Sequence, residues 1–174
     1  MTVQLTPAGL TTVPVIGALH IECFEDPWSE RSIADVLASP GVFAYLALAP
    51  AKSGGLNGIG RGAVGDPCGF AIARISGDEA ELLSIGVARG WRRTGIARRM
   101  IDTVLAAIER RRVRRLYLEV AEDNPGARAL YERYGFVQVG RRDAYYRRRD
   151  GTVSALTMCR PVGRAGLSWT AASL

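Results

Sequence analysis

The segment Arg92-Arg93-Thr94-Gly95-Ile96-Ala97 has the residue types of a turn that binds an anion. It follows a strand-like stretch with Leu83, Ile85 and Val87 on one side, and it opens a predicted helix. The apolar residues of that helix recur at helical spacing: Ile96, Met100, Ile101, Val104, Leu105 and Ile108. The first turn of a helix carries backbone N–H groups without partners and a partial positive charge. Glycine lets a ligand approach the backbone closely, and arginine keeps its charge. The segment therefore predicts a cradle for a pyrophosphate, with cations from Arg92, Arg93 and Arg98.

Two other phosphate-binding patterns do not fit this segment. A P-loop needs Gly-Lys-Ser/Thr, and a dinucleotide fingerprint needs three spaced glycines that open a helix. A solvated basic helix start is the alternative interpretation of the segment taken alone.

A second group of residues follows the predicted helix. Leu116, Leu118 and Val120 lie on one side of a predicted strand, which places Glu119 on the other side. Asn124-Pro125 then opens a shorter helix that Gly135 closes.

These two groups resemble the signatures of the GNAT acyltransferases. In that family Q/R-x-x-G-x-G/A wraps the pyrophosphate of coenzyme A, and L-E-V…N-x-x-A-x-x-L-Y-x-x-x-G-F marks the C-terminal half. The chain has Leu118-Glu119-Val120, Asn124 and Ala129 to Phe136 at matching distances. The resemblance is greatest to the branch of ribosomal-protein alanine N-acetyltransferases, the RimI branch. It covers about residues 3–160, without a glycine-rich insertion near 50–66 and the tail, 161–174.

Three further segments support that branch: Asp26-Pro27-Trp28-Ser29, Glu81 to Val87, and Arg142 to Tyr146. One departure is Ala97, which adds a methyl group where glycine is common. The helix and the cofactor must then sit slightly differently.

The resemblance implies a role for each matching residue. Glu119 matches the proton acceptor and Tyr131 the proton donor to the leaving thiolate. The acetyl-CoA contacts match Ile85, Gly86, Val87, Arg92, Arg93, Thr94, Gly95, Ile96, Ala97, Arg98 and Asn124. The substrate groove matches Trp28, Tyr145 and Tyr146, with Glu81 as a helper or as a contact of the substrate amine.

The residues themselves also supply the groups that acetyl transfer needs. A backbone N–H at a sheet irregularity near Gly86 can polarise a thioester carbonyl. A protein α-amine has a pKa near 8, so one carboxylate suffices to deprotonate it, and a phenol with a pKa of about 10 can protonate a thiolate. No metal is required.

Each assignment has a simpler alternative. Glu119 could be a solvated strand residue, and Glu81 competes with it as the base. Tyr131 could be a core aromatic residue, Asn124 a helix cap only, and Tyr145 and Tyr146 strand packing. We expect His20 to be an ordinary residue on a helix surface.

The order of elements predicts one α/β domain over residues 1–160, with a mixed, mostly antiparallel sheet flanked by helices. Helices are expected at 10–24 and, capped by Asp26 before Pro27, from there to about residue 40. Strands are expected at 42–48, 69–75, 79–87, 116–120, 136–140 and 153–160. The acetyl-CoA site falls on the strand–turn–helix near 83–98.

Composition fits an ordinary globular protein, which we expect to be cytoplasmic. The chain has 174 residues, of which 48% are hydrophobic and 23% are charged. Its three cysteines are far apart and it has one histidine, which argues against a zinc site or a disulfide framework. No apolar run is long enough to span a bilayer.

The net charge of +6 favours polyanionic surroundings such as a phosphorylated cofactor or a ribosome. The resemblance makes acetylation of a protein N-terminus the first hypothesis, with acetyl-CoA as co-substrate and a ribosomal protein as partner. A small-molecule amine or a lysine side chain is the alternative acceptor. A non-catalytic RNA-binding module using the arginines of 110–115 is less favoured, because no stacking aromatic residues accompany them. The sequence leaves the oligomeric state open.

Overall fold

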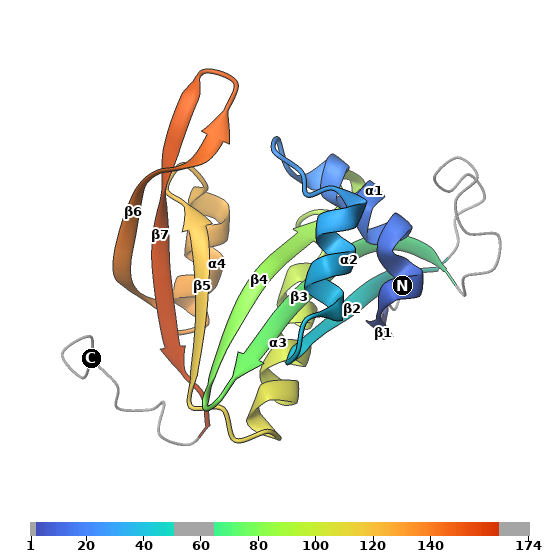
Figure 1. Ribbon diagram of the computed structural model, residues 1–174, viewed down its shortest axis with the longest axis horizontal. Coiled ribbons are helices and arrows are strands. Elements are labelled where there is room, and N and C mark those ends of the chain that lie inside the picture. Colours follow the sequence, from blue (N-terminus) through green and yellow to red (C-terminus); the bar gives the residue numbers. More distant parts are fainter. Residues whose placement is uncertain (1–2, 51–64, 164–174) are drawn as a thin grey trace. The chain divides into compact units, whose positions relative to one another are not determined.

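A computed structural model describes residues 3–50 and 65–163 (Figure 1). The predicted insertion and tail therefore lie mostly outside the described residues. Within these ranges there are four α-helices, and their bounds are α1 Val13–Cys23, α2 Glu30–Ala38, α3 Ile96–Glu109 and α4 Pro125–Arg133. Two short 3-10 helices are η1 (Leu10–Thr12) and η2 (Arg89–Trp91).

Seven strands in the described ranges form one mixed sheet in the order β1-β2-β3-β4-β5-β7-β6. Their bounds are β1 Gln4–Ala8, β2 Val42–Ala49, β3 Asp66–Ser76, β4 Glu79–Val87, β5 Arg115–Ala121, β6 Val137–Arg148 and β7 Gly151–Pro161. β4 and β5 pair in parallel, whereas β1–β2, β5–β7 and β6–β7 pair antiparallel. The predicted α/β class and mixed sheet are confirmed.

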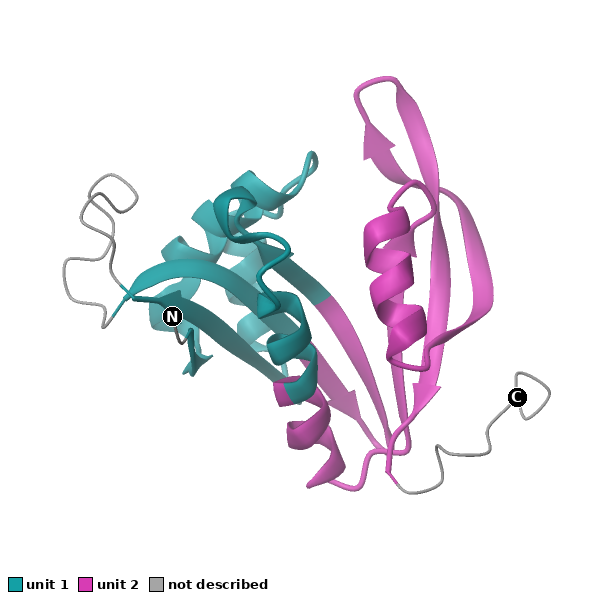
Figure 2. Ribbon diagram, turned by 180° about the vertical axis from the view of Figure 1, so that it is seen from behind, with its two compact units in different colours: residues 1–72, 84–102 teal, residues 73–83, 103–174 magenta. Residues whose placement is uncertain are grey.

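The chain divides into two compact units, which Figure 2 colours separately. Unit 1 consists of residues 1–72 and 84–102, and it holds α1, α2, the first half of α3 and strands β1 and β2. Helices α1 and α2 cover one face of its strands and α3 the other (Figure 1). Its largest buried side chains come from both layers: Ile16, Leu19, Ile33, Phe70, Ile72, Ile96, Met100 and Ile101. The predicted apolar face of α3 is thus confirmed.

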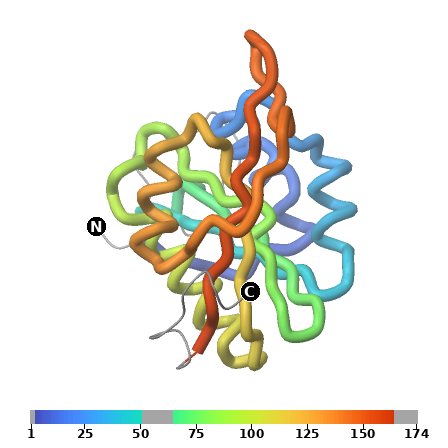
Figure 3. The backbone as a smooth tube through the Cα atoms, turned by 90° about the vertical axis from the view of Figure 1, so that its left-hand side faces the viewer, coloured from blue at the N-terminus to red at the C-terminus, as the bar shows by residue number. Residues whose placement is uncertain are grey.

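Unit 2 consists of residues 73–83 and 103–174. Its centre is β5, where Leu116, Leu118 and Val120 are buried as their alternation predicted. β5 pairs with β7 along its whole length, and β6 and β7 run side by side as a long hairpin (Figure 3). Helix α4 packs against these strands through Tyr131, which is buried beside Phe136.

The predicted cap of α2 is wrong. The helix begins at Glu30, and the hydroxyl oxygen of Ser29 accepts the N–H of Ser32 at 3.1 Å. Ser29 has extended backbone angles, φ −68° and ψ 157°, so the helix cannot begin before it. Pro27 therefore precedes the helix rather than opening it.

The predicted strand at 136–140 is too short. β6 continues to Arg148, because the polar segment 141–148 pairs with the well-patterned β7. Backbone pairing, rather than apolar alternation, makes this segment a strand. No helix in the described part of the chain is long and apolar enough to cross a membrane.

Candidate active site

The turn between β4 and α3 has the backbone of an anion cradle. Gly95 has φ +87° and Arg93 has φ +65°, both in the left-handed region. Glycine adopts this region freely, whereas arginine is strained there. Backbone N–H groups in such alternating turns form concave sites for anions, and the start of α3 adds its own N–H groups.

Side chains of the turn stabilise this shape. The hydroxyl of Thr94 donates to the carbonyl of Trp91 at 2.5 Å. The Nε of Arg92 donates to the carbonyl of Val87 at 3.2 Å, where β4 ends. Arg92 therefore holds the turn as well as supplying a charge. Arg93 and Arg98 are exposed.

Gly86 lies in the buried row of β4, between the half-buried Ile85 and Val87. A Cβ atom at this position would lie 2.7 Å from the ring of Phe70 and 3.0 Å from Sγ of Cys23. Packing alone thus requires glycine here. The sequence suggested an irregularity at Gly86, which stays a prediction.

His20 is buried, with 2% of its surface exposed, so its predicted surface position is wrong. Its Nδ1 accepts the backbone N–H of Trp28 at 3.1 Å, which leaves Nε2 to donate to the hydroxyl of Ser84 at 3.2 Å. Its ring stacks on Phe24, Trp28 and Phe70. Burial lowers the pKa of His20 to about 4, so the ring is neutral at physiological pH.

This network positions Trp28, the predicted groove residue of unit 1. The indole is half-buried, with its ring centroid 5.2 Å from that of His20. Ser84 directly precedes the cofactor-contact candidates of β4. One buried imidazole therefore ties the segment that carries Trp28 to the strand that carries those candidates.

Unit 2 brings Glu119 together with two side chains of β6. The Glu119 side chain is 19% exposed, and its Oε1 accepts Nη1 of Arg142 at 3.0 Å. Tyr145 stands next to them, and its pKa is raised by partial burial and then by the charge of Glu119 and a hydrogen bond to it. The predicted base is therefore a held, largely shielded carboxylate rather than a solvated one.

Unit 2 holds two more tyrosines, and one of them, Tyr146, interacts with this carboxylate. Burial, followed by the charge of Glu119, raises the pKa of Tyr146 to about 12. Tyr131 is buried on α4, and burial raises its pKa well above the ordinary value, with a smaller contribution from Tyr146. Its phenol is therefore protonated at neutral pH.

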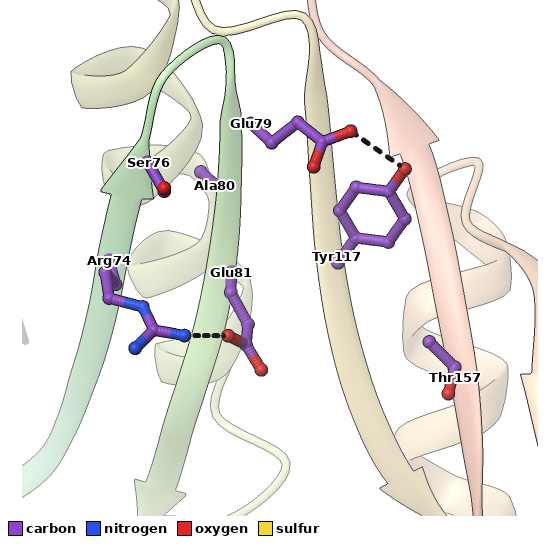
Figure 4. A pocket seen from close by; sticks show the side chains of 7 residues that line it. All are labelled: Arg74, Ser76, Glu79, Ala80, Glu81, Tyr117 and Thr157. Atoms are coloured by element: carbon purple, nitrogen blue, oxygen red, sulfur yellow. Dashed lines mark hydrogen bonds and ion pairs between the residues drawn. The ribbon is translucent and has the colours of Figure 1, made fainter.

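Glu81 lies on the same face of the sheet, because it pairs with Tyr117 across the parallel β4–β5 register. It lines an open pocket of about 340 Å³. Figure 4 shows the residues that line this pocket: Arg74, Ser76, Glu79, Ala80, Glu81, Tyr117 and Thr157. Its Oε2 accepts Nη2 of Arg74 at 2.9 Å. Thr157 pairs with Glu119 across β5–β7, so the pocket adjoins that carboxylate.

Asn124 caps α4. Its side-chain oxygen accepts the N–H of Ala127 at 3.0 Å, and Pro125 follows it as the first helical residue. The structural role of Asn124 is thus plain, and it is compatible with a second role at a cofactor. No cluster of three or more potential metal ligands occurs among the described residues.

Sequence reasoning missed His20, Ser84, Arg74 and Arg142 as members of these groups. A signal existed for Arg74, which lies seven residues from Glu81 across a turn and so faces it on a hairpin. The others meet partners 8 to 64 residues away, which local patterns do not connect.

Known proteins are similar to this chain in both sequence and fold. The [Ribosomal protein bS18]-alanine N-acetyltransferase of Escherichia coli K12 is 31% identical over 159 residues, covering 90% of this chain and 97% of that protein. The N-alpha-acetyltransferase RimI of Mycobacterium tuberculosis is 34% identical over 139 residues, covering 80% and 78%.

Among solved structures, the ribosomal-protein-S18-alanine N-acetyltransferase from Escherichia coli superposes with a TM-score of 0.80 at 27% identity, covering 97% of this chain and 99% of that one. Arabidopsis thaliana NAA60 in complex with acetyl-CoA shares the fold, with a TM-score of 0.77 at 19% identity over 92% of this chain and 99% of that one. Residues 14–136, more than half of the chain, match the acetyltransferase (GNAT) family. The chain therefore belongs to the acetyltransferase (GNAT) family.

Proposed function

We propose that this protein is an N-alpha-acetyltransferase that uses acetyl-CoA to acetylate the N-terminal alanine of a small-subunit ribosomal protein. The observation that carries the proposal is the 31% identity that extends over 97% of the bS18-alanine N-acetyltransferase of Escherichia coli. A match of that extent includes the acceptor side of the domain as well as the cradle. Acetylation of a ribosomal protein places the reaction in the cytoplasm.

The donor side is assigned to unit 1. The cradle offers the N–H groups of a left-handed turn and the start of α3 to the pyrophosphate, and arginines surround it. The residues assigned to acetyl-CoA are Ile85, Gly86, Val87, Arg92 to Arg98 and, from unit 2, Asn124. The bound acetyl-CoA supplies an activated acetyl thioester.

The acceptor side is assigned to Glu119 and its neighbours. Glu119 accepts a proton from the acceptor ammonium, so that an N–H bond breaks and an O–H bond forms. The neutral nitrogen then attacks the thioester carbonyl within one ternary complex: a C–N bond forms, the C–S bond breaks, and the nitrogen loses its second proton to water. Tyr131 donates its phenolic proton to the departing thiolate. The tyrosine takes a proton back as the site resets.

The proton demands of this reaction favour an α-amine. A protein α-amine has a pKa near 8, so a sizeable minority is neutral at pH 7, whereas lysine has a pKa of about 10.4. One carboxylate held by Arg142 therefore suffices for the α-amine. Trp28, Glu81, Tyr145 and Tyr146 are assigned to contacts with the acceptor peptide.

The experiment compares acetyl transfer to two peptides: one with a free N-terminal alanine, and one that is N-blocked with a single internal lysine. We expect turnover on the free N-terminus only. Glu119→Gln and Tyr131→Phe should each reduce it about 10²-fold or more. Tyr134→Phe removes a hydroxyl from the C-terminal end of the same helix and is the matched control.

Other results would contradict parts of this proposal. Turnover on lysine would refute the assigned acceptor. Indifference to Glu119→Gln combined with loss in Glu81→Gln would move the base to Glu81. Substituting Trp28, Tyr145 or Tyr146 singly should raise the KM for the peptide and spare acetyl-CoA affinity, and no change in KM would remove them from the groove.

A further inference from the structure

Strand β6 contains a local irregularity beside Glu119. Arg142 pairs with Ala155 of β7, and Tyr146 pairs with Val153, so three residues of β6 face the single Ser154 between these pairs. Ala144, within this bulge, has φ +52°. Non-glycine residues rarely adopt that conformation, and bulges of this kind re-aim side chains next to functional sites.

The bulge changes which side chains share a face. Residues 142 and 145 would point to opposite faces of a regular strand, because side chains alternate. Here the guanidinium carbon of Arg142 lies 4.1 Å from the centroid of the Tyr145 ring. The planar guanidinium is therefore supported by an aromatic ring as well as by the carboxylate of Glu119.

Arg142 differs from the other arginines of the hairpin in the burial of its carboxylate partner. Arg141 pairs with the exposed Glu122 and Asp143, and the half-buried Arg148, which also lies over the Tyr146 ring, pairs with the exposed Asp123. Arg142 pairs with a carboxylate that is 19% exposed. A carboxylate has about four acceptor sites on two oxygens, so an ion pair at Oε1 leaves capacity for a proton from an amine.

We propose that Arg142 is a positioning residue of the acetyl-transfer reaction, which holds the Glu119 carboxylate in the orientation that receives the proton of the acceptor amine. The inference rests on the proposed function, in which Glu119 is the base. Arg142 acts through Glu119: the ion pair fixes one carboxylate oxygen, the Tyr145 ring fixes the guanidinium, and the bulge brings that ring to Arg142.

The test is a double-mutant cycle on the free-alanine peptide, with kcat and peptide KM measured separately. Arg142→Gln should lower kcat about 10-fold, as expected for a misplaced reacting group, and leave KM within about 2-fold. In the Glu119→Gln background the same change should alter kcat less than about 2-fold, because its partner is already gone. Arg142→Lys keeps the charge without the planar stack and should recover part of the loss.

Arg147→Gln is the matched control, because it removes the same charge from an exposed position on the same strand. It should change kcat by less than about 2-fold. Arg142 is itself more than half exposed, so its variants should keep the unfolding midpoint of the wild type.

Several results would overturn the inference. A loss in Arg142→Gln that persists undiminished in the Glu119→Gln background would mean that Arg142 acts without Glu119. A rise confined to peptide KM would make it an acceptor contact instead. A loss equalled by Arg147→Gln would reduce it to surface charge. If Glu119→Gln slows turnover and Arg142→Gln does not, only the positioning inference fails. If Glu119→Gln has no effect, the base assignment fails and this inference fails with it.

Discussion

Acidification should destabilise this protein through a single buried imidazole. Burial lowers the pKa of His20 from 6.5 to about 4 in the folded chain, while the unfolded chain keeps the ordinary value. Between these two values the unfolded state binds a proton that the folded state does not. The stability therefore falls as the pH falls below 6.5, and the loss is complete below about pH 4.

The structure gives the reason for this resistance to protonation. Nδ1 of His20 accepts the N–H of Trp28, and its ring lies among Phe24, Trp28 and Phe70. A proton on Nδ1 would turn this nitrogen into a donor that faces another donor, the N–H of Trp28. It would also place a positive charge among aromatic rings. From the two pKa values, going from pH 7.5 to pH 5 costs about 2 kcal/mol of unfolding free energy, at 1.36 kcal/mol for each pKa unit.

The assay is urea unfolding between pH 7.5 and pH 5, on the wild type and on His20→Gln. The variant lacks the titrating ring, so the difference between the two pH dependences isolates His20 from the carboxylates. Because His20 is the only histidine of the chain, its imidazole proton resonances can also be followed directly by NMR. Equal losses in the two proteins, or an imidazole that titrates near pH 6.5, would refute the reasoning.

Three glycine and cap positions give further predictions. Gly86→Ala should destabilise the protein by about 1–3 kcal/mol, because its Cβ would lie 2.7 Å from Phe70. Gly90→Ala, with open space around it, is the control in thermal unfolding. Equal melting temperatures of the two variants would contradict the predicted clash. In Gly95→Ala the alanine must adopt φ +87°, which should lower the free energy of unfolding by about 1 kcal/mol or more. The same change should raise the KM for acetyl-CoA, and an unchanged KM would exclude the turn as the cradle. Asn124→Ala should cost about 1 kcal/mol, and Asn124→Ser should restore most of it; a cap-only role would leave acetyl-CoA affinity unchanged in both.

The elements that the sequence predicted well are those whose burial is periodic along the chain. Examples are the apolar residues of α3 and the alternating Leu116, Leu118 and Val120 of β5. Their spacing predicts the buried side directly, because the period of a helix or strand fixes the side on which each residue lies. The turn at Gly95 was predictable for a similar reason, since glycine marks a left-handed backbone.

His20 was not predictable by such reasoning. A polar residue on a helix is ordinarily exposed, and its burial here depends on the N–H of Trp28 and the hydroxyl of Ser84, which satisfy both ring nitrogens. Neither partner is a neighbour on the helix. The same limit explains the length of β6, whose polar residues become a strand only because β7 pairs with them.

The two candidates for the base, Glu81 and Glu119, differ in the surroundings of the arginine that pairs with each of them. Arg74 reaches Glu81 across the β3–β4 hairpin, through the regular geometry of neighbouring strands, and both side chains are well exposed. Arg142 reaches Glu119 from a paired position of β6, and the bulge that follows it, with a left-handed alanine, brings the Tyr145 ring onto its guanidinium. Strain of that kind persists where the surrounding structure imposes it, and the surrounding structure here converges on Glu119. This asymmetry is the structural reason for preferring Glu119 as the base, and it is independent of the family pattern that first pointed to it.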